Sequence, residues 1–141
     1  MKVFILEDDV NCSPIIEWIA ERFEVKYVRN IEDAVYYLEY ENGSDKCDKF
    51  IFDASVPGAV IIHNDGREEA YDCDLNGIDF MISCFTRLRL NEKGKKVAVL
   101  SAYDVMVKNC NIPEEIRDKV EIISKNDNDL IKMLQDFLEM H

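Results

Sequence analysis

Acidic, hydroxyl and ammonium side chains come directly after short apolar stretches in this 141-residue sequence. A run of three acids follows the first stretch, and an aspartate ends the third. A serine follows the fourth stretch, and a serine and a lysine follow the fifth. The residues are Glu7, Asp8, Asp9, Asp53, Ser101, Ser124 and Lys125. Carboxylates and hydroxyls are hard oxygen ligands that suit Mg²⁺, and an ammonium group can offset the charge of a phosphoryl group.

The apolar stretches before these residues have the composition of buried parallel strands. Several lack alternation and are rich in β-branched residues, which suits strands covered on both faces. We predict strands at Val3–Leu6, Val25–Val28, Phe50–Phe52, Val97–Leu100 and Val120–Ile123. Stretches with helical spacing lie between them, so the chain is predicted to form an α/β fold with a parallel sheet and right-handed crossovers.

Capping residues predict where the helices begin. Ser13, followed by proline, predicts the N-cap of the first helix, and Asn30 caps the second. Asn126 or Asp127 caps the last, and a shorter helix after the fourth strand is limited or restarted by Pro113. The predicted inward-facing residues of the four main helices are Ile15, Ile16, Ile19, Ala20 and Phe23; Ile31, Ala34, Val35 and Leu38; Ile78, Met81, Ile82, Phe85 and Leu88; and Leu130, Ile131, Leu134, Phe137 and Leu138.

The predicted sheet brings the polar residues together at its carboxyl edge, where open α/β sheets bind ligands. Neighbouring strands lie about 4.8 Å apart, so acids after the first and third strands can share one cation. Lys125 would lie two strands from Asp53, roughly 10 Å away, which a lysine side chain largely spans. Crowded carboxylates repel unless a divalent ion or a positive side chain compensates. We therefore predict a phosphoryl-transfer site in which Asp53 attacks while Mg²⁺ and Lys125 offset charge on the transferred oxygens.

Each of these residues taken alone has a simple structural explanation. Acids after a strand often cap a helix, Asp53 can be a turn residue, and Ser101 can be a cap. A lysine such as Lys125 is ordinarily solvated at the start of a helix. The joint occurrence of all four features at strand ends favours the functional interpretation.

Composition narrows the class of protein further. Hydrophobic residues make up 48% of the chain, enough for the core of a single domain spanning residues 1–141. The net charge of −12 disfavours nucleic-acid binding and favours metal cations and basic protein surfaces. Five cysteines without a close pair and two histidines disfavour a zinc site and fit a reducing cytoplasm. The apolar run at the N-terminus is too short for a signal sequence or a membrane span.

One irregular region lies between Pro57 and Gly77. Within it, Val60–His63, a turn at Asn64-Asp65-Gly66 and an acidic stretch predict a small hairpin, because Asp-Gly favours a tight turn.

Five sequence blocks resemble the receiver domain of bacterial two-component response regulators, in particular its single-domain, chemotaxis-regulator-like form. The blocks are Val3–Asp9, Phe50–Gly58, Asp74–Ile78, Val97–Ala102 and Ile123–Lys125. Together they extend over nearly the whole chain outside the irregular region. The resemblance implies a flavodoxin-like, doubly wound, five-stranded parallel sheet of order 2-1-3-4-5. It also implies an insertion after strand 3, approximately residues 59–74, about sixteen residues longer than the family usually has there.

The resemblance implies a role for each site residue. Asp53 matches the phosphoacceptor, Asp8 matches a direct Mg²⁺ ligand, and Glu7 matches an acid that holds the ion through water. The remaining assignments are the backbone carbonyl of Ser55 as a Mg²⁺ ligand, Ser101 as the switch hydroxyl, Lys125 as the lysine that pairs with the phosphoryl group, and Asp9 as a cap or an outer acid. The implied phosphoryl donor is a histidine kinase or a histidine phosphotransfer protein.

Two single positions depart from the family pattern. Ile122 stands where the family has its switch aromatic, so rotation of that ring cannot transmit a signal here. Asn126 stands where a proline typically follows the lysine, and a cis bond before it would cost about 3 kcal/mol, so we predict a trans bond and an altered position for Lys125.

Three functions remain open at the level of the sequence. The first is a cytoplasmic, non-enzymatic phosphoacceptor without an attached effector domain, acting through contacts with a downstream protein. The second is a receiver-like binding module that does not use phosphorylation, and Ile122 and Asn126 motivate it. The third is an aspartate-nucleophile phosphatase of the haloacid-dehalogenase type. That enzyme needs a second aspartate two residues after the nucleophile as general acid, and this position is Ser55 here.

Overall fold

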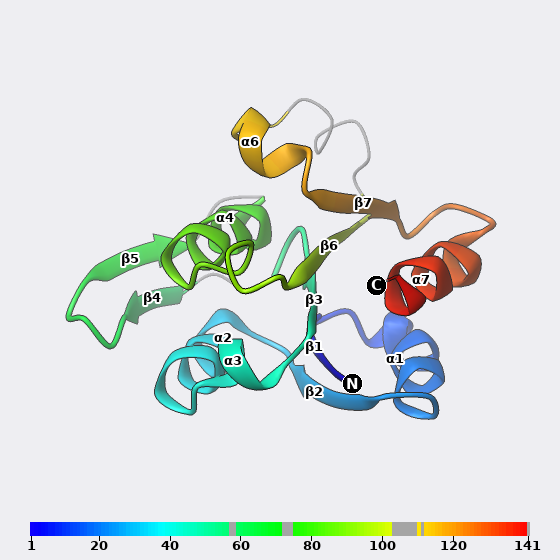
Figure 1. The fold of residues 1–141 in the computed structure, drawn as a ribbon, viewed down its shortest axis with the longest axis horizontal. Helices are drawn as coiled ribbons and strands as arrows, with labels where there is room; N and C mark the ends of the chain where they lie inside the picture. The colour runs from blue at the N-terminus through cyan, green and yellow to red at the C-terminus, as the bar shows by residue number, and fades with distance from the viewer. Residues whose placement is uncertain (57–58, 72–74, 103–109, 111, 141) are drawn as a thin grey trace.

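Five parallel strands form the central sheet, in the order β2-β1-β3-β6-β7 (Figure 1). The computed structural model describes residues 1–56, 59–71, 75–102, 110 and 112–140. The strands are β1 (Lys2–Leu6), β2 (Glu24–Val28), β3 (Lys49–Asp53), β6 (Lys96–Ser101) and β7 (Val120–Ser124). All five predicted strands are confirmed, each with its ends extended by at most one residue. Because β6 and β7 are the fourth and fifth strands of this sheet along the chain, the predicted order 2-1-3-4-5 is also confirmed.

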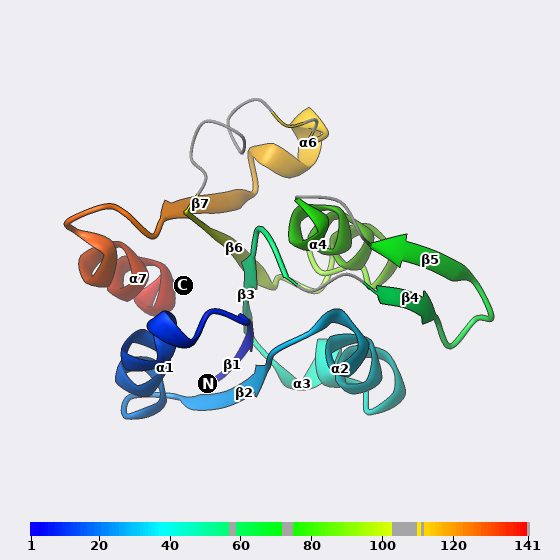
Figure 2. The ribbon, with the colours of Figure 1, turned by 180° about the vertical axis from the view of Figure 1, so that it is seen from behind.

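Helices cover both faces of the sheet (Figures 1 and 2). On one side, α1 (Ser13–Ala20) and α7 (Leu130–Glu139) pack over a cluster that includes Ile19, Leu134 and Phe137. On the other side lie α2 (Ile31–Val35), α3 (Gly43–Lys46) and α4 (Asn76–Arg87), with a larger core centred on phenylalanines of β1 and β3. Every residue of β3 is buried, which is why its sequence shows no polar alternation.

Asn30 caps the second helix as predicted. Its side-chain oxygen accepts a hydrogen bond from the backbone amide of Asp33 at 2.8 Å. Beyond α2 the chain continues as a short π-helical segment, η2 (Tyr36–Tyr40). All four predicted inward-facing residues of this region are buried: Ile31, Ala34, Val35 and Leu38.

The predicted start of the first helix is wrong by one turn. A 3₁₀ turn, η1 (Val10–Cys12), precedes α1, and the Asp9 carboxylate accepts a hydrogen bond from the amide of Asn11 at 2.9 Å. Ser13 therefore lies inside continuous helical backbone and cannot be the N-cap. Asp9 is the N-cap of η1, which confirms the first of its two expected roles, a cap or an outer acid of the site. Ala20, placed on the inner stripe by its spacing, is exposed.

The C-terminal half of the chain has the predicted elements, with two corrections. The N-cap residue of α7 is Asp129, without a side-chain hydrogen bond, so neither Asn126 nor Asp127 caps this helix; Asp127 accepts a hydrogen bond from the amide of Asp129 at 2.8 Å in the turn before it. Ile131, placed on the inner face by its spacing, is 41% exposed. Pro113 precedes the short helix α6 (Glu114–Arg117). The helix predicted directly after Ser101 falls largely on residues 103–109, which lie outside the described residues.

The irregular region contains the predicted hairpin. Strands β4 (Ala59–Ile62) and β5 (Glu68–Tyr71) pair in an antiparallel register, and Gly66 in the turn has φ of +86°, a conformation that glycine adopts without strain. Pro57, Gly58, Cys73 and Asp74 lie outside the described residues. That this segment is an insertion relative to the family stays a prediction.

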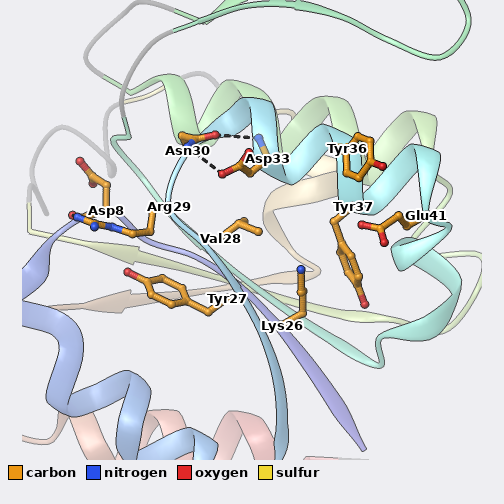
Figure 3. Close-up of a pocket in the computed structure, with 10 residues that line it drawn as sticks. All are labelled: Asp8, Lys26, Tyr27, Val28, Arg29, Asn30, Asp33, Tyr36, Tyr37 and Glu41. Carbon is orange, nitrogen blue, oxygen red and sulfur yellow. Dashed lines mark hydrogen bonds between the residues drawn. The ribbon is translucent and has the colours of Figure 1, made fainter.

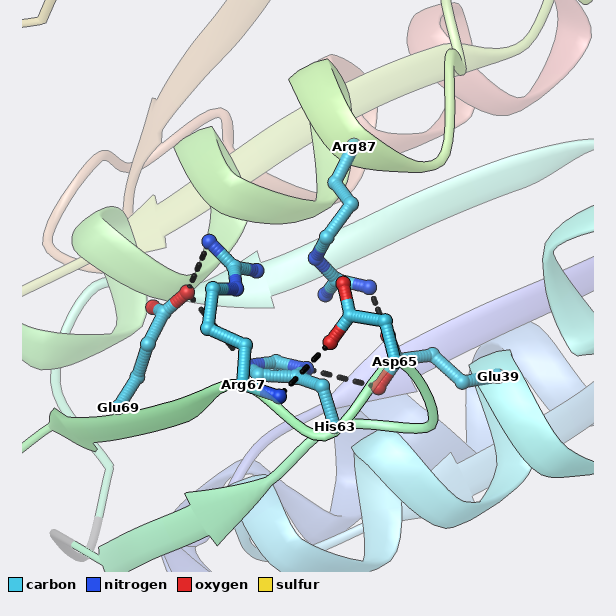
Figure 4. A network of polar contacts seen from close by, with 6 residues as sticks. All are labelled: Glu39, His63, Asp65, Arg67, Glu69 and Arg87. Atoms are coloured by element: carbon cyan, nitrogen blue, oxygen red, sulfur yellow. Dashed lines mark hydrogen bonds and ion pairs between the residues drawn. The ribbon is translucent and has the colours of Figure 1, made fainter.

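A network of polar side chains, centred on the buried His63 and Glu39, attaches the hairpin to the domain (Figure 4). Nδ1 of His63 lies 2.9 Å from Oε2 of Glu39 on η2, and Arg87 of α4 pairs with the other oxygen of Glu39. Glu69 of β5 lies 3.6 Å from Nε2 of His63 and 2.5 Å from Arg67. Since His63 and Glu39 are almost completely buried, these contacts join the hairpin to two helices as one structural unit.

Candidate functional site

Three carboxylates converge at the carboxyl edge of the sheet. Glu7 and Asp8 follow β1, Asp53 ends the neighbouring strand β3, and one oxygen of each lies within 4.8 Å of the others. The strand register explains the approach, because Leu6 is directly opposite Phe52. Glu7 and Asp53 are buried, with exposed fractions of 0% and 4%, while Asp8 is half-buried.

Lys125 reaches this cluster from the far side of β6. Its Nζ lies 2.5 Å from Oε1 of Glu7 and 3.3 Å from Oδ1 of Asp53. Burial disfavours the charged ammonium, but Glu7 and Asp53 more than offset this and raise the pKa of Lys125 above its ordinary value. The lysine is thus held as a cation between Glu7 and Asp53. The side chain of Lys125 reaches Asp53, as the sequence predicts.

The carboxylates also raise the pKa values of their neighbours. Burial, followed by the neighbouring Glu7, raises the pKa of Asp53 from 3.8 to about 7, although Lys125 works in the opposite direction. Burial and then Asp53 raise the pKa of Asp8. The single charge of Lys125 does not balance three carboxylates. At neutral pH, therefore, either one of the carboxylates takes up a proton or the cluster binds another cation.

The donor set fits Mg²⁺. The ligands are hard carboxylate oxygens, and Oε2 of the fully buried Glu7 has no hydrogen-bond partner among the described residues. A buried carboxylate oxygen without a donor is costly, and a hydrated cation nearby would supply one. Asp8, Asp53 and Glu7 are placed to surround such an ion.

The loop after Asp53 is held tightly by the start of α4. Asn76 brackets Val56: its Oδ1 accepts from the Val56 amide at 2.9 Å, and its Nδ2 donates to the Val56 carbonyl at 2.5 Å. Gly77 lies so close that a Cβ there would be 1.8 Å from the Asp53 carbonyl oxygen. The amide of Ser55 donates to Oδ1 of Asp53 at 3.3 Å, which places Ser55 beside the acids; its backbone carbonyl as a Mg²⁺ ligand stays a prediction.

Ser101 occupies the neighbouring strand. Leu100 is the register partner of Asp53, so Ser101 is one residue further towards the carboxyl edge, and it is buried. Its backbone carbonyl accepts a hydrogen bond from the amide of Lys125 at 2.8 Å. The structure therefore brings Glu7, Asp8, Asp53, Ser101 and Lys125 to one place.

Two neighbours of the site were not predicted as such. The Cys12 sulfur lies within 4.8 Å of oxygens of Glu7 and Asp9, and burial followed by Glu7 raises the thiol pKa to about 12. Cys12 is therefore a neutral thiol at the edge of the acidic cluster. Asn76 was identified only as part of a matching block; an asparagine before glycine at a helix start is the signal that could have indicated its bracing role.

Solved structures similar to this one include response regulators and their receiver domains. The receiver domain of the Francisella response regulator 1452 superposes with a TM-score of 0.60 at 17% identity, covering 94% of this chain and 88% of that one. The Mn²⁺-bound form of response regulator Rcp1 superposes with a TM-score of 0.59 at 16% identity, covering 99% of this chain and 96% of that one. The response regulator TrrA from Thermotoga maritima, in complex with Mg²⁺-BeF, superposes with a TM-score of 0.59 at 17% identity, covering 96% of this chain and 97% of that one.

The chain has the fold of a response-regulator receiver domain. No family model and no curated protein matches the sequence. Because a shared fold alone does not establish shared chemistry, the function of this receiver fold has to be argued from its site.

Both single departures from the family pattern are visible in the receiver fold. Ile122 lies on β7, partly buried against the larger core. The described residues contain no cis peptide bond, so the bond between Lys125 and Asn126 is trans, as predicted. The Asn126 side chain donates to the carbonyl of Ala102 at 3.1 Å, which links the ends of β6 and β7.

Among the residues described, none of the helices has the length and apolarity needed to cross a membrane.

Proposed function

We propose that this protein is a phosphoacceptor receiver of two-component or phosphorelay signalling, with Asp53 as the residue that is phosphorylated. The observation that supports this most directly is the convergence of Glu7, Asp8, Asp53 and Lys125 within a few ångströms, on a receiver fold. Structural acids have no need to crowd in this way, because crowding costs stability.

Each residue has a part in the proposed transfer. An oxygen of Asp53 attacks the phosphorus of the donor, the bond from phosphorus to the donor breaks, and an acyl phosphate forms on Asp53. Bound Mg²⁺ would neutralise charge on the phosphoryl oxygens, held by Asp8, Asp53, the Ser55 carbonyl and, through water, Glu7.

Lys125 and Ser101 complete the proposed site. Lys125, already 3.3 Å from Asp53, pairs with a phosphoryl oxygen, and the Ser101 hydroxyl donates to another. The proposed donor is a histidine kinase or a histidine phosphotransfer protein. The output is contact with a downstream protein rather than catalytic turnover. The proposed location is the cytoplasm, where thiols such as those of Cys12 and Cys47 stay reduced.

Phosphorylation can be tested directly by mass spectrometry. We expect incubation with acetyl phosphate and Mg²⁺ to add the mass of one phosphoryl group, and Asp53→Asn to abolish the addition. Asp118→Asn makes the same chemical change at an exposed position away from the acid cluster and should be modified like the wild type. Absence of any addition with several small phosphoryl donors and a histidine kinase would count against the proposal, as would an addition that persists in Asp53→Asn.

The alternative is a binding module that does not use phosphorylation. It is favoured by Ile122, which stands in place of the family's switch aromatic. The same experiment separates the two functions, because a module of that kind would take no phosphoryl group. The phosphatase alternative lacks its general acid at Ser55, and measurable turnover of a generic phosphomonoester would be needed to support it.

A further inference from the structure

One exposed helical face of this protein is both acidic and aromatic. The face is made by Glu32, Asp33, Tyr36, Tyr40 and Glu41, all of them exposed, and we call it the acidic–tyrosine face. No lysine or arginine occurs between Asn30 and Glu41. The rings of Tyr36 and Tyr40 stack at 6.0 Å between centroids, with 61% and 54% of these residues exposed to solvent.

The π-helical geometry of η2 accounts for this arrangement. The amide of Glu41 donates to the carbonyl of Tyr36 at 3.1 Å, five residues earlier, so one residue more than usual fits into the turn. Glu39 then points inwards to His63 and Arg87, while Tyr36 and Tyr40 both point outwards. π-Helical turns of this kind occur frequently at functional sites, and tyrosine is enriched in protein–protein interfaces relative to the rest of the surface.

A cleft of about 740 Å³ lies beside this face (Figure 3). Asp33, Tyr36 and Glu41 line it from the helical side, and strand β2, at the edge of the sheet, lines it from the other. At one end of the cleft Tyr36 and Glu41 lie together, and at the other end lies Asp8. Three residues of the acidic–tyrosine face, Asp33, Tyr36 and Glu41, therefore form one wall of a groove that leads towards the acid cluster, while Glu32 and Tyr40 lie outside the lining.

The basic residues that line the cleft already have partners. Nζ of Lys26 lies over the ring of Tyr37, 5.0 Å from its centroid, and Arg29 donates to the backbone carbonyl of Asp8 at 3.3 Å. Neither contact neutralises its cation, so the lining carries three carboxylates, those of Asp8, Asp33 and Glu41, against two cations. The excess negative charge can attract a further cation from outside.

We propose that the acidic–tyrosine face binds an arginine-bearing segment of a partner protein. A guanidinium group stacks on tyrosine rings and forms paired hydrogen bonds with carboxylates. The groove offers the ring of Tyr36 beside the carboxylates of Asp33 and Glu41, and the ring of Tyr40 stacks on that of Tyr36. The net charge of −12 attracts a basic partner over a longer range. This proposal is independent of phosphorylation at Asp53, because the tyrosines and Glu41 take no part in that site.

The test uses the whole protein and a synthetic peptide that alternates arginine and serine, titrated at fixed ionic strength. We expect saturable binding, several-fold weaker with lysine in place of arginine and absent with glutamate. The double variant Tyr36→Ala/Tyr40→Ala should weaken binding roughly tenfold, while Tyr36→Phe/Tyr40→Phe, which keeps both rings, should retain most of it. All four tyrosine changes are at exposed positions, and thermal denaturation would verify that the variants are folded.

A pair of charge variants separates a specific site from general attraction. Glu41→Gln on the face should weaken binding several-fold, whereas Glu121→Gln, an exposed position on β7, should leave it almost unchanged. Equal weakening by both variants would show charge attraction without a site and overturn the proposal. Absence of saturable binding, or binding that survives loss of both tyrosine rings, would overturn it as well.

Discussion

Replacement of Asp53 by asparagine is expected to stabilise the protein in the absence of Mg²⁺. Asp53 is buried beside Glu7, and its pKa is raised from 3.8 to about 7. A raised pKa means that the folded state favours the neutral carboxyl, whereas the unfolded chain ionises it freely. Stability is therefore complete below the ordinary pKa and is lost as the pH rises towards 7. Asparagine has nearly the same shape and carries no charge, so it avoids this loss.

The size of the effect follows from the two pKa values. Their difference corresponds to about 4 kcal/mol once Asp53 is fully ionised, with 1.36 kcal/mol for each pKa unit. The raised pKa already includes the attraction of Lys125, so we expect Asp53→Asn to be more stable by about 4 kcal/mol at pH 7.5. The gain should fall to about two fifths of that value at pH 5.

Urea denaturation between pH 5 and pH 8, with and without Mg²⁺, measures this gain. Added Mg²⁺ should narrow the difference, because it binds and stabilises the wild type more than the variant. Asp118→Asn, at an exposed position, should follow the wild type at every pH. Equal or lower stability of Asp53→Asn at pH 7.5, or a difference that does not change with pH, would refute the reasoning from crowded carboxylates.

Three further outcomes are expected. The affinity for Mg²⁺ should increase with pH and level off above about 7, because the proton on Asp53 must leave, and calorimetry in buffers of different ionisation enthalpy should detect its release. Gly77→Ala should cost about 1–3 kcal/mol in urea denaturation and slow phosphorylation, since its Cβ would collide with the Asp53 carbonyl; unchanged values for both would contradict the close approach. Lys49→Met should also cost about 1–3 kcal/mol, because the buried Nζ donates to the carbonyls of Phe137 and Met140, and the exposed Lys96→Met should cost little by the same measurement.

Much of the fold and of the candidate site follows from local sequence signals. A strand such as Phe50–Phe52 is recognisable because burial on both faces removes polar alternation. Asn30 is recognisable as a cap because its side chain bonds to a backbone amide only three residues away. The turn at Asp65-Gly66 is equally local. Errors arose where neighbouring geometry decides: Ser13 has the right residue type for a cap, but the turn before it displaced the helix start.

The sequence by itself determined which side chains could act, namely the acids, the serine and the lysine at the strand ends, because a parallel sheet brings those ends to one edge. Only the tertiary structure decided how closely they meet. The ion pair between Lys125 and Glu7, the raised pKa of Asp53 and the inward turn of Glu39 depend on burial and on neighbours distant along the chain. Charges interact through space, and their strength is set by the surrounding medium, so spacing along the sequence cannot supply either quantity.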